Sequence, residues 1–167
     1  VTERHPNALS VRFRPEIRRL SFGKGPEAST FAAIADASGF GITFASPDED
    51  TLAEVGALGC PTLHLPSQGY PEGLFVDDRT GSLLFFHDHE WEPAILKGAL
   101  ETEAFYIGAQ GSLRARAARD AALRGLGVSE TGIARLRGPV GLIPSARDPR
   151  TLAVSVLAEV FSQAMAD

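Results

Sequence analysis

Cysteine is almost absent from the sequence, since Cys60 is the single one among 167 residues. An intramolecular disulfide is therefore excluded, and so is a zinc or iron–sulfur site built from several cysteines of this chain. A lone cysteine is most often a small buried apolar residue. For Cys60 the alternative is a thiolate that binds a soft metal.

Long apolar runs and an excess of positive charge are also missing. No stretch approaches the roughly 20 apolar residues that cross a bilayer, and the start lacks the basic-then-apolar pattern of a secretion signal. The chain has 16 Lys and Arg against 21 Asp and Glu, and its net charge of −5 argues against a nucleic-acid partner. We therefore expect a soluble, cytoplasmic domain with no membrane span.

What the sequence does contain is enough apolar residues, 44%, for the core of one domain. Residues 1–16 show no clear period and are interpreted as a lead-in, and residues 17–167 as the domain. Short apolar runs predict strands over 17–22, 41–45, 62–65, 82–86, 104–107 and 140–143. Helical patterns lie between them, over 26–38, from 48 onward, and over 93–100, 112–126, 129–136 and 149–164. This alternation predicts an α/β fold, a Rossmann-like parallel sheet with helices on both faces in three layers.

Ligands of such folds bind outside the carboxyl ends of the strands, so the turns after the strands are the places to search. The first turn, G-K-G-P-E-A, places Gly23, Gly25 and Ala28 in a G-x-G-x-x-G/A pattern. Its glycines permit a tight turn and a close approach of the backbone to a pyrophosphate. Pro26 removes one N–H donor and Glu27 adds a negative charge, so the alternative is a tight turn that binds no dinucleotide.

An NAD(P)-dependent oxidoreductase is the alternative function that this pattern raises, with His87 or His89 as the proton donor. A dinucleotide site also needs an acidic residue at the end of the second strand to hold the ribose. Ser46 occupies that place, and Asp48 follows two residues later, where it suits either the ribose or a helix cap. A third class, an interaction module whose turns hold no ligand, also remains open.

Four ionisable residues in a row end the fourth predicted strand: His87, Asp88, His89 and Glu90. Extended geometry would place the two histidines on one side. Paired histidines with carboxylates bind metals or transfer protons, although no other His or Cys supplies an obvious third ligand. The alternative is a structural role, in which these four side chains only form hydrogen bonds with backbone and loop groups at the edge of the sheet.

The next turn, G-A-Q-G-S, has the composition of an anion-binding loop. Ser112 suits a helix cap, and the amides that follow Gly111 would point outward. Arg114 and Arg116 lie in the first turns of the helix, where guanidinium groups bind phosphate in a forked geometry. Together with Gly108, these residues predict a phosphate site, against the alternative of a capped helix with solvated arginines.

Four segments in order resemble the C-terminal Rossmann domain of the XdhC/CoxI family, the xanthine dehydrogenase accessory factors. They are F-H-D-H-E-W-E-P-A-I-L-K-G-A-L, A-F-Y-I-G-A-Q-G-S-L-R-A-R-A-A-R, L-G-V-S-E-T-G-I-A-R-L-R-G-P-V-G-L and A-R-D-P-R-T-L-A-V-S-V-L-A-E-V. The resemblance covers about half of the chain strongly, from Phe85 onward, and residues 17–65 only at the level of the fold.

The resemblance implies a chaperone rather than a catalyst. Such a protein binds molybdopterin, the pterin of the molybdenum cofactor, and delivers it to a xanthine dehydrogenase-like molybdenum hydroxylase. The anion at Gly111 and Ser112 would then be the phosphate or pyrophosphate of the cofactor, with Arg114 as a flanking charge and residues 87–90 in the neighbouring turn. The resemblance and the broad apolar face of the last helix also favour a homodimer.

Several positions depart from the family pattern. The family usually has a second arginine after G-S, where this chain has Leu113, and it usually reads G-L-D-I-G-A where this chain reads G-L-I-P-S-A over 141–146. The first turn of the family resembles G-A-G-H and here is G-K-G-P. The cysteine-bearing N-terminal segment of the family has no counterpart in the sequence. A shortened relative with another ligand is therefore an open alternative.

Overall fold

The computed structural model describes residues 16–87 and 90–165, and within them the chain forms one parallel sheet flanked by helices. The strands are β1 (Arg18–Gly23), β2 (Ile42–Ser46), β3 (Thr62–His64), β4 (Thr80–Phe85), β5 (Tyr106–Ala109) and β6 (Leu136–Arg137). The helices are α1 (Pro26–Ala37), α2 (Glu49–Gly56), α3 (Glu92–Leu100), α4 (Leu113–Gly125), α5 (Glu130–Arg135) and α6 (Pro149–Ala164).

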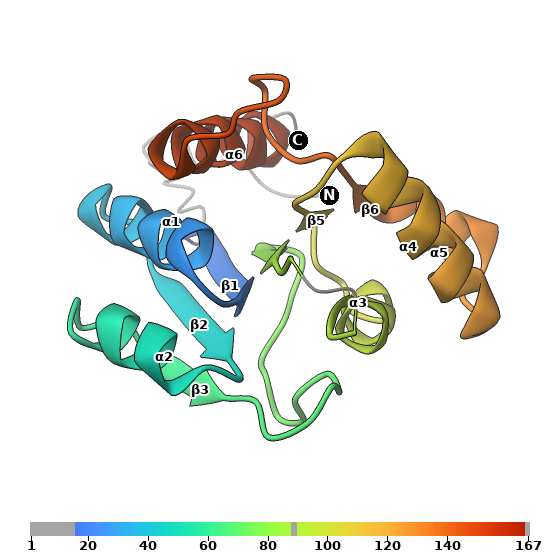
Figure 1. Ribbon diagram of the computed structural model, residues 1–167, viewed down its shortest axis with the longest axis horizontal. Helices are drawn as coiled ribbons and strands as arrows, with labels where there is room; N and C mark the ends of the chain where they lie inside the picture. Colours follow the sequence, from blue (N-terminus) through green and yellow to red (C-terminus); the bar gives the residue numbers. More distant parts are fainter. Residues whose placement is uncertain (1–15, 88–89, 166–167) are drawn as a thin grey trace, which may run out of the picture.

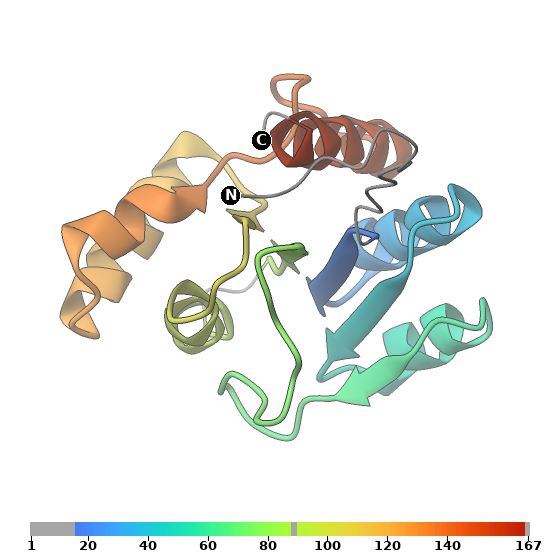
Figure 2. The same ribbon diagram turned by 180° about the vertical axis from the view of Figure 1, so that it is seen from behind.

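The sheet has the strand order β3-β2-β1-β4-β5-β6, and every recorded pair is parallel. Helices α1, α2 and α6 cover one face, and α3, α4 and α5 cover the other (Figure 1; Figure 2 shows the same layers from behind). The predicted three-layer Rossmann-like architecture is therefore confirmed. Strand order reverses between β1 and β4, and this switch point is where such sheets place their ligands.

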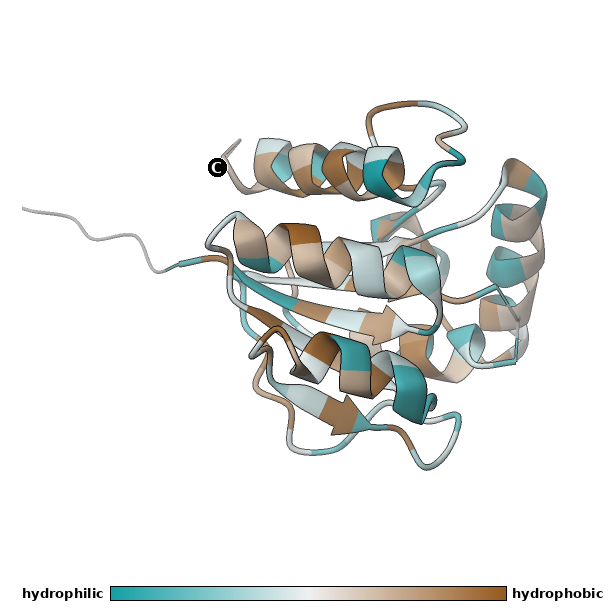
Figure 3. Ribbon diagram, turned by 60° about the vertical axis from the view of Figure 1, so that its left-hand side comes forward, coloured by the Kyte–Doolittle hydropathy of each residue, from teal (hydrophilic) through white to brown (hydrophobic). Residues whose placement is uncertain are grey.

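Two apolar clusters hold the layers together, one on each face of the sheet. Phe31 on α1 and Val156 on α6 pack with Phe44 of β2 on the first face, whereas Leu96 on α3 and Ile107 of β5 lie in the second cluster. Strands buried on both sides explain why their sequences read as continuous apolar runs without alternation. Figure 3 shows that hydrophobic and hydrophilic residues share the turns of the helices on the first face, as expected for helices that are half buried.

One predicted strand, over 140–143, is wrong. Residues 138–148 form a loop instead, and the sixth strand is the short β6 just before it. Pro139 and Pro144 lack the amide that a strand ladder needs, and Gly141 has φ 105°, a conformation outside the β region. The other predicted elements are present, with their ends moved by at most two residues.

Helix α6 uses its apolar face within the molecule. Leu152, Val156 and Val160 are buried, and α6 lies beside α1 (Figures 1 and 3). That face is therefore buried within the molecule and is not a free surface for dimerisation. The homodimer stays a prediction, which the apolar face of α6 no longer supports.

Among the described residues, no helix is long and apolar enough to cross a membrane.

Candidate functional site

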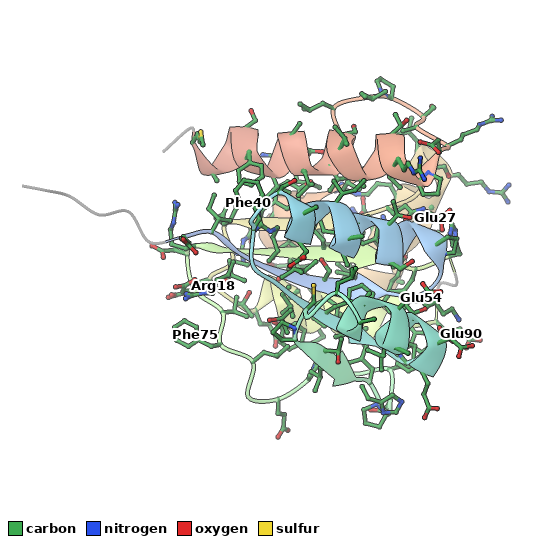
Figure 4. All side chains as sticks on the ribbon, turned by 90° about the vertical axis from the view of Figure 1, so that its left-hand side faces the viewer. Arg18, Glu27, Phe40, Glu54, Phe75 and Glu90 are labelled. Atoms are coloured by element: carbon green, nitrogen blue, oxygen red, sulfur yellow. The ribbon has the colours of Figure 1, made fainter. Side chains whose placement is uncertain are left out.

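The predicted turns lie along one edge of the sheet. In the parallel registers Gly23 pairs with Phe85, and Leu84 pairs with Ala109, so β1, β4 and β5 end at neighbouring points. Figure 4 shows Glu27 and Glu90 at this carboxyl edge and Phe40 at the opposite end. Asp88 and His89 lie outside the described residues. The histidine turn and the Ser112 turn thus share the rim on which the sequence hypothesis depends.

The glycine turn after β1 has the tight geometry that its sequence predicts. A Cβ on Gly23 would lie 2.6 Å from the carbonyl oxygen of Phe85 and 3.0 Å from Cβ of Ala28, and Gly25 has φ 80°. Ala28 is fully buried, which lets α1 approach the sheet closely. The pattern is therefore explained by the packing of strand against helix.

The same turn has few donors left for a pyrophosphate. The amide of Gly25 donates to Oγ1 of Thr51 at 3.1 Å, and Pro26 has no N–H. Asp48 accepts hydrogen bonds from both the amide and the hydroxyl of Thr51, and these bonds lower the pKa of Asp48. Ser46 is fully buried and its Oγ accepts from the amide of Asp48. Asp48 is thus a helix cap, and the buried hydroxyl of Ser46 is engaged with the amide of Asp48.

Glu27 meets His87 across the switch point. Nε2 of His87 lies 3.1 Å from Oε2 of Glu27, and their side chains are 62% and 19% exposed. Oε2 of Glu27 is buried and receives no hydrogen bond among the described residues, so the two groups are in close contact without hydrogen-bond geometry. This carboxylate occupies the end of α1 where a dinucleotide would place its phosphate.

A groove lies between the β5–α4 turn and the loop that follows β6. Its volume is about 480 Å³, and its lining comprises Gly111, Ser112, Leu113, Arg114, Pro139, Ser145, Ala146 and Arg147. Arg114 and Arg147 are both exposed and bring two cations to one groove of an acidic protein. Ser145 has φ 57°, an uncommon backbone conformation for a residue with a side chain and one found at ligand sites.

The N-terminus of α4 adds partial positive charge to this groove. Oγ of Ser112 accepts the amide of Ala115 at 3.1 Å, and the other first-turn amides have no partner within the helix. The positive end of α6 is nearby in sequence, but Asp148 caps it by accepting from the amide of Thr151 at 2.8 Å. Both helices are capped, but the cap of α4 is a neutral serine and that of α6 a carboxylate, so the end of α4 is the more favourable of the two for an anion.

Buried polar contacts fix one wall of the groove. Arg119 is 3% exposed and Glu92 1% exposed, and they form a forked ion pair of 3.1 and 3.0 Å. Arg119 also donates to the carbonyl of Gln110 at 2.7 Å, which holds the turn before Gly111. A Cβ on Gly111 would lie 3.3 Å from Nη2 of Arg119. The turn at Gly111 therefore packs directly against the guanidinium of Arg119.

Arg116 does not face a ligand, which corrects its sequence interpretation. Its guanidinium binds Asp120 at 2.7 Å and donates to the carbonyls of Leu136 and Gly138 at 2.8 and 3.3 Å. Arg116 therefore ties α4 to the start of the loop. Gly108 is also a packing residue: it lies inside β5, and a Cβ there would lie 2.6 Å from the ring of Tyr106.

The opposite wall is anchored to α6. The amide of Ile143 donates to Oγ of Ser155 at 2.7 Å, and the amide of Gly141 donates to the carboxylate of Glu159. Sequence reasoning missed this wall, including Ser145 and Arg147, because the run V-G-L-I was interpreted as a strand. The two prolines that bracket this run are the signal that would have revealed a loop.

Cys60 plays no part at this edge. It is 7% exposed, it precedes β3 and so lies toward the amino edge, and burial raises the pKa of its thiol. Its prediction as a buried apolar residue is confirmed. Within residues 16–87 and 90–165, no three His, Cys, Asp or Glu side chains are grouped as metal ligands.

The chain is similar to known proteins in family, in sequence and in structure. A model of the XdhC Rossmann domain family matches residues 20–160. The chain is 34% identical over 156 residues to the molybdenum cofactor insertion chaperone PaoD of Escherichia coli K12, a match covering 93% of this chain and 43% of PaoD. A solved structure described as a xanthine dehydrogenase from Bacillus halodurans superposes with a TM-score of 0.74 at 21% identity, over 91% of this chain and 44% of that one. The chain thus spans less than half the length of these relatives.

Proposed function

Because the chain belongs to the XdhC Rossmann domain family, we propose that it binds the molybdenum cofactor as cargo and passes it to a xanthine dehydrogenase-like molybdenum hydroxylase. The observation that carries the proposal is the groove at the carboxyl edge, where Arg114, Arg147 and the N-terminal end of α4 face one space. The relative named as a molybdenum cofactor insertion chaperone supports the choice of cargo.

The phosphate of the cofactor is assigned to the groove. The first-turn amides of α4 donate to its oxygens, and Arg114 and Arg147 approach it from the two walls. The fixed positions of the β5–α4 turn and the loop lower the ordering cost of binding. The glycine turn after β1 is poor in donors, which favours a phosphorylated pterin over NAD(P) as the ligand.

In this proposal the protein is a carrier and not a catalyst. Its residues hold the cargo by charge and hydrogen bonds, and transfer needs no covalent step on this chain. Leu113, Leu142 and Ile143 are exposed apolar residues on or near the groove, at 76%, 58% and 48%. Such exposed residues suit the transient contact with a hydroxylase that delivery requires.

Retention of purified molybdenum cofactor in size-exclusion chromatography tests the proposal. The wild type should co-elute with the cofactor, and the double variant R114A/R147A should lose about tenfold or more in affinity, because each arginine forms a charge-assisted contact. The control is R124A, which changes an exposed arginine at the far end of α4. Absence of retention by the wild type, with a full-length accessory factor retaining the cofactor in parallel, would refute the function.

A further inference from the structure

We infer that a recess adjoining the groove binds the flat ring of the cargo, and that Oε1 of Gln110 accepts a hydrogen bond from an N–H of this ring. The inference rests on the proposed function and deepens it, because it assigns a place to the part of the ligand beyond the phosphate. Gln110 then selects a ring that carries an N–H over one that carries none.

The recess shares one wall with the groove. Its volume is about 140 Å³, and its lining comprises Gln110, Gly111, Pro139, Val140, Ile143, Ser145, Ala146 and Leu152. Half of this lining also belongs to the groove, namely Gly111, Pro139, Ser145 and Ala146. A ligand with its phosphate in the groove can therefore extend into the recess.

The walls of the recess are mainly apolar. Val140 and Leu152 are 6% and 7% exposed, and the described residues that line the recess include no charged side chain. A charged group that entered it would lose hydration without meeting an opposite charge. The recess therefore suits a neutral ring, whereas the groove, with Arg114 and Arg147, suits the phosphate.

Oε1 of Gln110 is an acceptor in this lining that lacks a partner. It is buried and has no hydrogen bond among the described residues. The backbone of Gln110 is held on both sides, because its amide donates to the carbonyl of Leu84 at 2.9 Å and its carbonyl accepts from Arg119 at 2.7 Å. A buried acceptor without a partner costs free energy, which a donor on a ligand recovers.

The chemistry of the ring matches the recess. A carboxamide oxygen only accepts hydrogen bonds, so the matching group on the ligand is an N–H. A pterin carries such donors at its 2-amino group and at N3, and its flat faces suit aliphatic walls. The cargo is then held by its phosphate in the groove and by its ring in the recess.

Fluorescence titration of the whole chain with pterin and with 1,3-dimethyllumazine tests the inference. Both are pteridine rings without a phosphate, but 1,3-dimethyllumazine is methylated at both pyrimidine nitrogens and has no N–H. The wild type should bind pterin about tenfold more tightly. Gln110→Met keeps an unbranched stem and should lose about tenfold in pterin affinity, with no loss for 1,3-dimethyllumazine. Gln68→Met changes an exposed glutamine and should match the wild type.

A second variant tests the apolar wall separately from the hydrogen bond. Ile143→Ala removes part of this wall and should weaken the binding of both rings about fivefold. The double variant R114A/R147A should keep its affinity for pterin, because this probe has no phosphate. The wild-type ratio and Ile143→Ala are informative even without a folded Gln110→Met variant.

The inference is overturned if the wild type binds the two rings equally or does not bind pterin. Unchanged pterin affinity in folded Gln110→Met or in Ile143→Ala overturns it as well. The proposed function fails separately, when the wild type does not retain the complete cofactor. If retention persists and depends on Arg114 and Arg147 while Gln110→Met has no effect, the groove assignment stands and the role of Gln110 falls.

Discussion

The buried ion pair beneath the Gly111 turn allows a quantitative prediction. Replacing Arg119 with methionine keeps an unbranched stem but removes the guanidinium that faces Glu92, whose own residue is 1% exposed. Removing one partner of a buried pair costs about 3–5 kcal/mol of folding free energy. In a domain of this size each kcal/mol lowers the Tm by about 2–4 °C, so R119M should melt about 6–20 °C below the wild type.

The double variant R119M/E92M is the matched control, since it removes both charges at once. Apolar replacement of a whole buried pair is often near neutral. The double variant should therefore recover more than half of the loss of R119M, in thermal melts followed by circular dichroism. A Tm of R119M within about 2 °C of the wild type, or a double variant no more stable than R119M, would refute the reasoning.

Three further predictions concern positions away from this pair. Gly23→Ala should lower the unfolding free energy by about 1–3 kcal/mol in urea titrations, because its Cβ would lie 2.6 Å from the carbonyl oxygen of Phe85. Gly125→Ala has no atom within 4 Å and is the control, so equal midpoints would contradict the packing argument. Hydrogen bonds from Thr51 hold the pKa of Asp48 below its ordinary 3.8. The ionised Asp48 therefore stabilises the fold fully above pH 3.8, and this contribution is lost as the pH falls through the lowered pKa. The stability gap between the wild type and Asp48→Asn should therefore be full near neutral pH and shrink in acid; a gap constant with pH would exclude this role. Cys60 is buried and its pKa is raised, so a thiol reagent should modify it at the rate of unfolding, and reaction as fast as that of a free thiol would disprove its burial.

The layered fold was predictable because strong local signals agreed with one architecture. Apolar runs buried on both faces, with amphipathic patterns between them, have few other solutions than a parallel sheet covered by helices. Gly23 and Gly25 marked the first turn correctly, since only glycine fits the close approach and the positive φ found there. The convergence of the turns then follows from the parallel order alone.

The second wall of the groove was not predictable in the same way. Its loop is held by Ser155 and Glu159, which lie far along the chain and show no local signal of that contact. Arg116 and Arg119 likewise look like solvated arginines of a helix, and their inward contacts depend on the loop after β6 and on Glu92 of another helix. Long-range polar pairing of this kind leaves no periodic pattern in the sequence.

The most direct test of the central claim is a crystal structure of this protein with the bound cofactor or a phosphorylated pterin derived from it. We expect phosphate density in the groove, within hydrogen-bond distance of the first-turn amides of α4 and of Arg114 or Arg147. Phosphate density at the Gly23–Gly25 turn instead, or a ligand bound away from the carboxyl edge of the sheet, would contradict it.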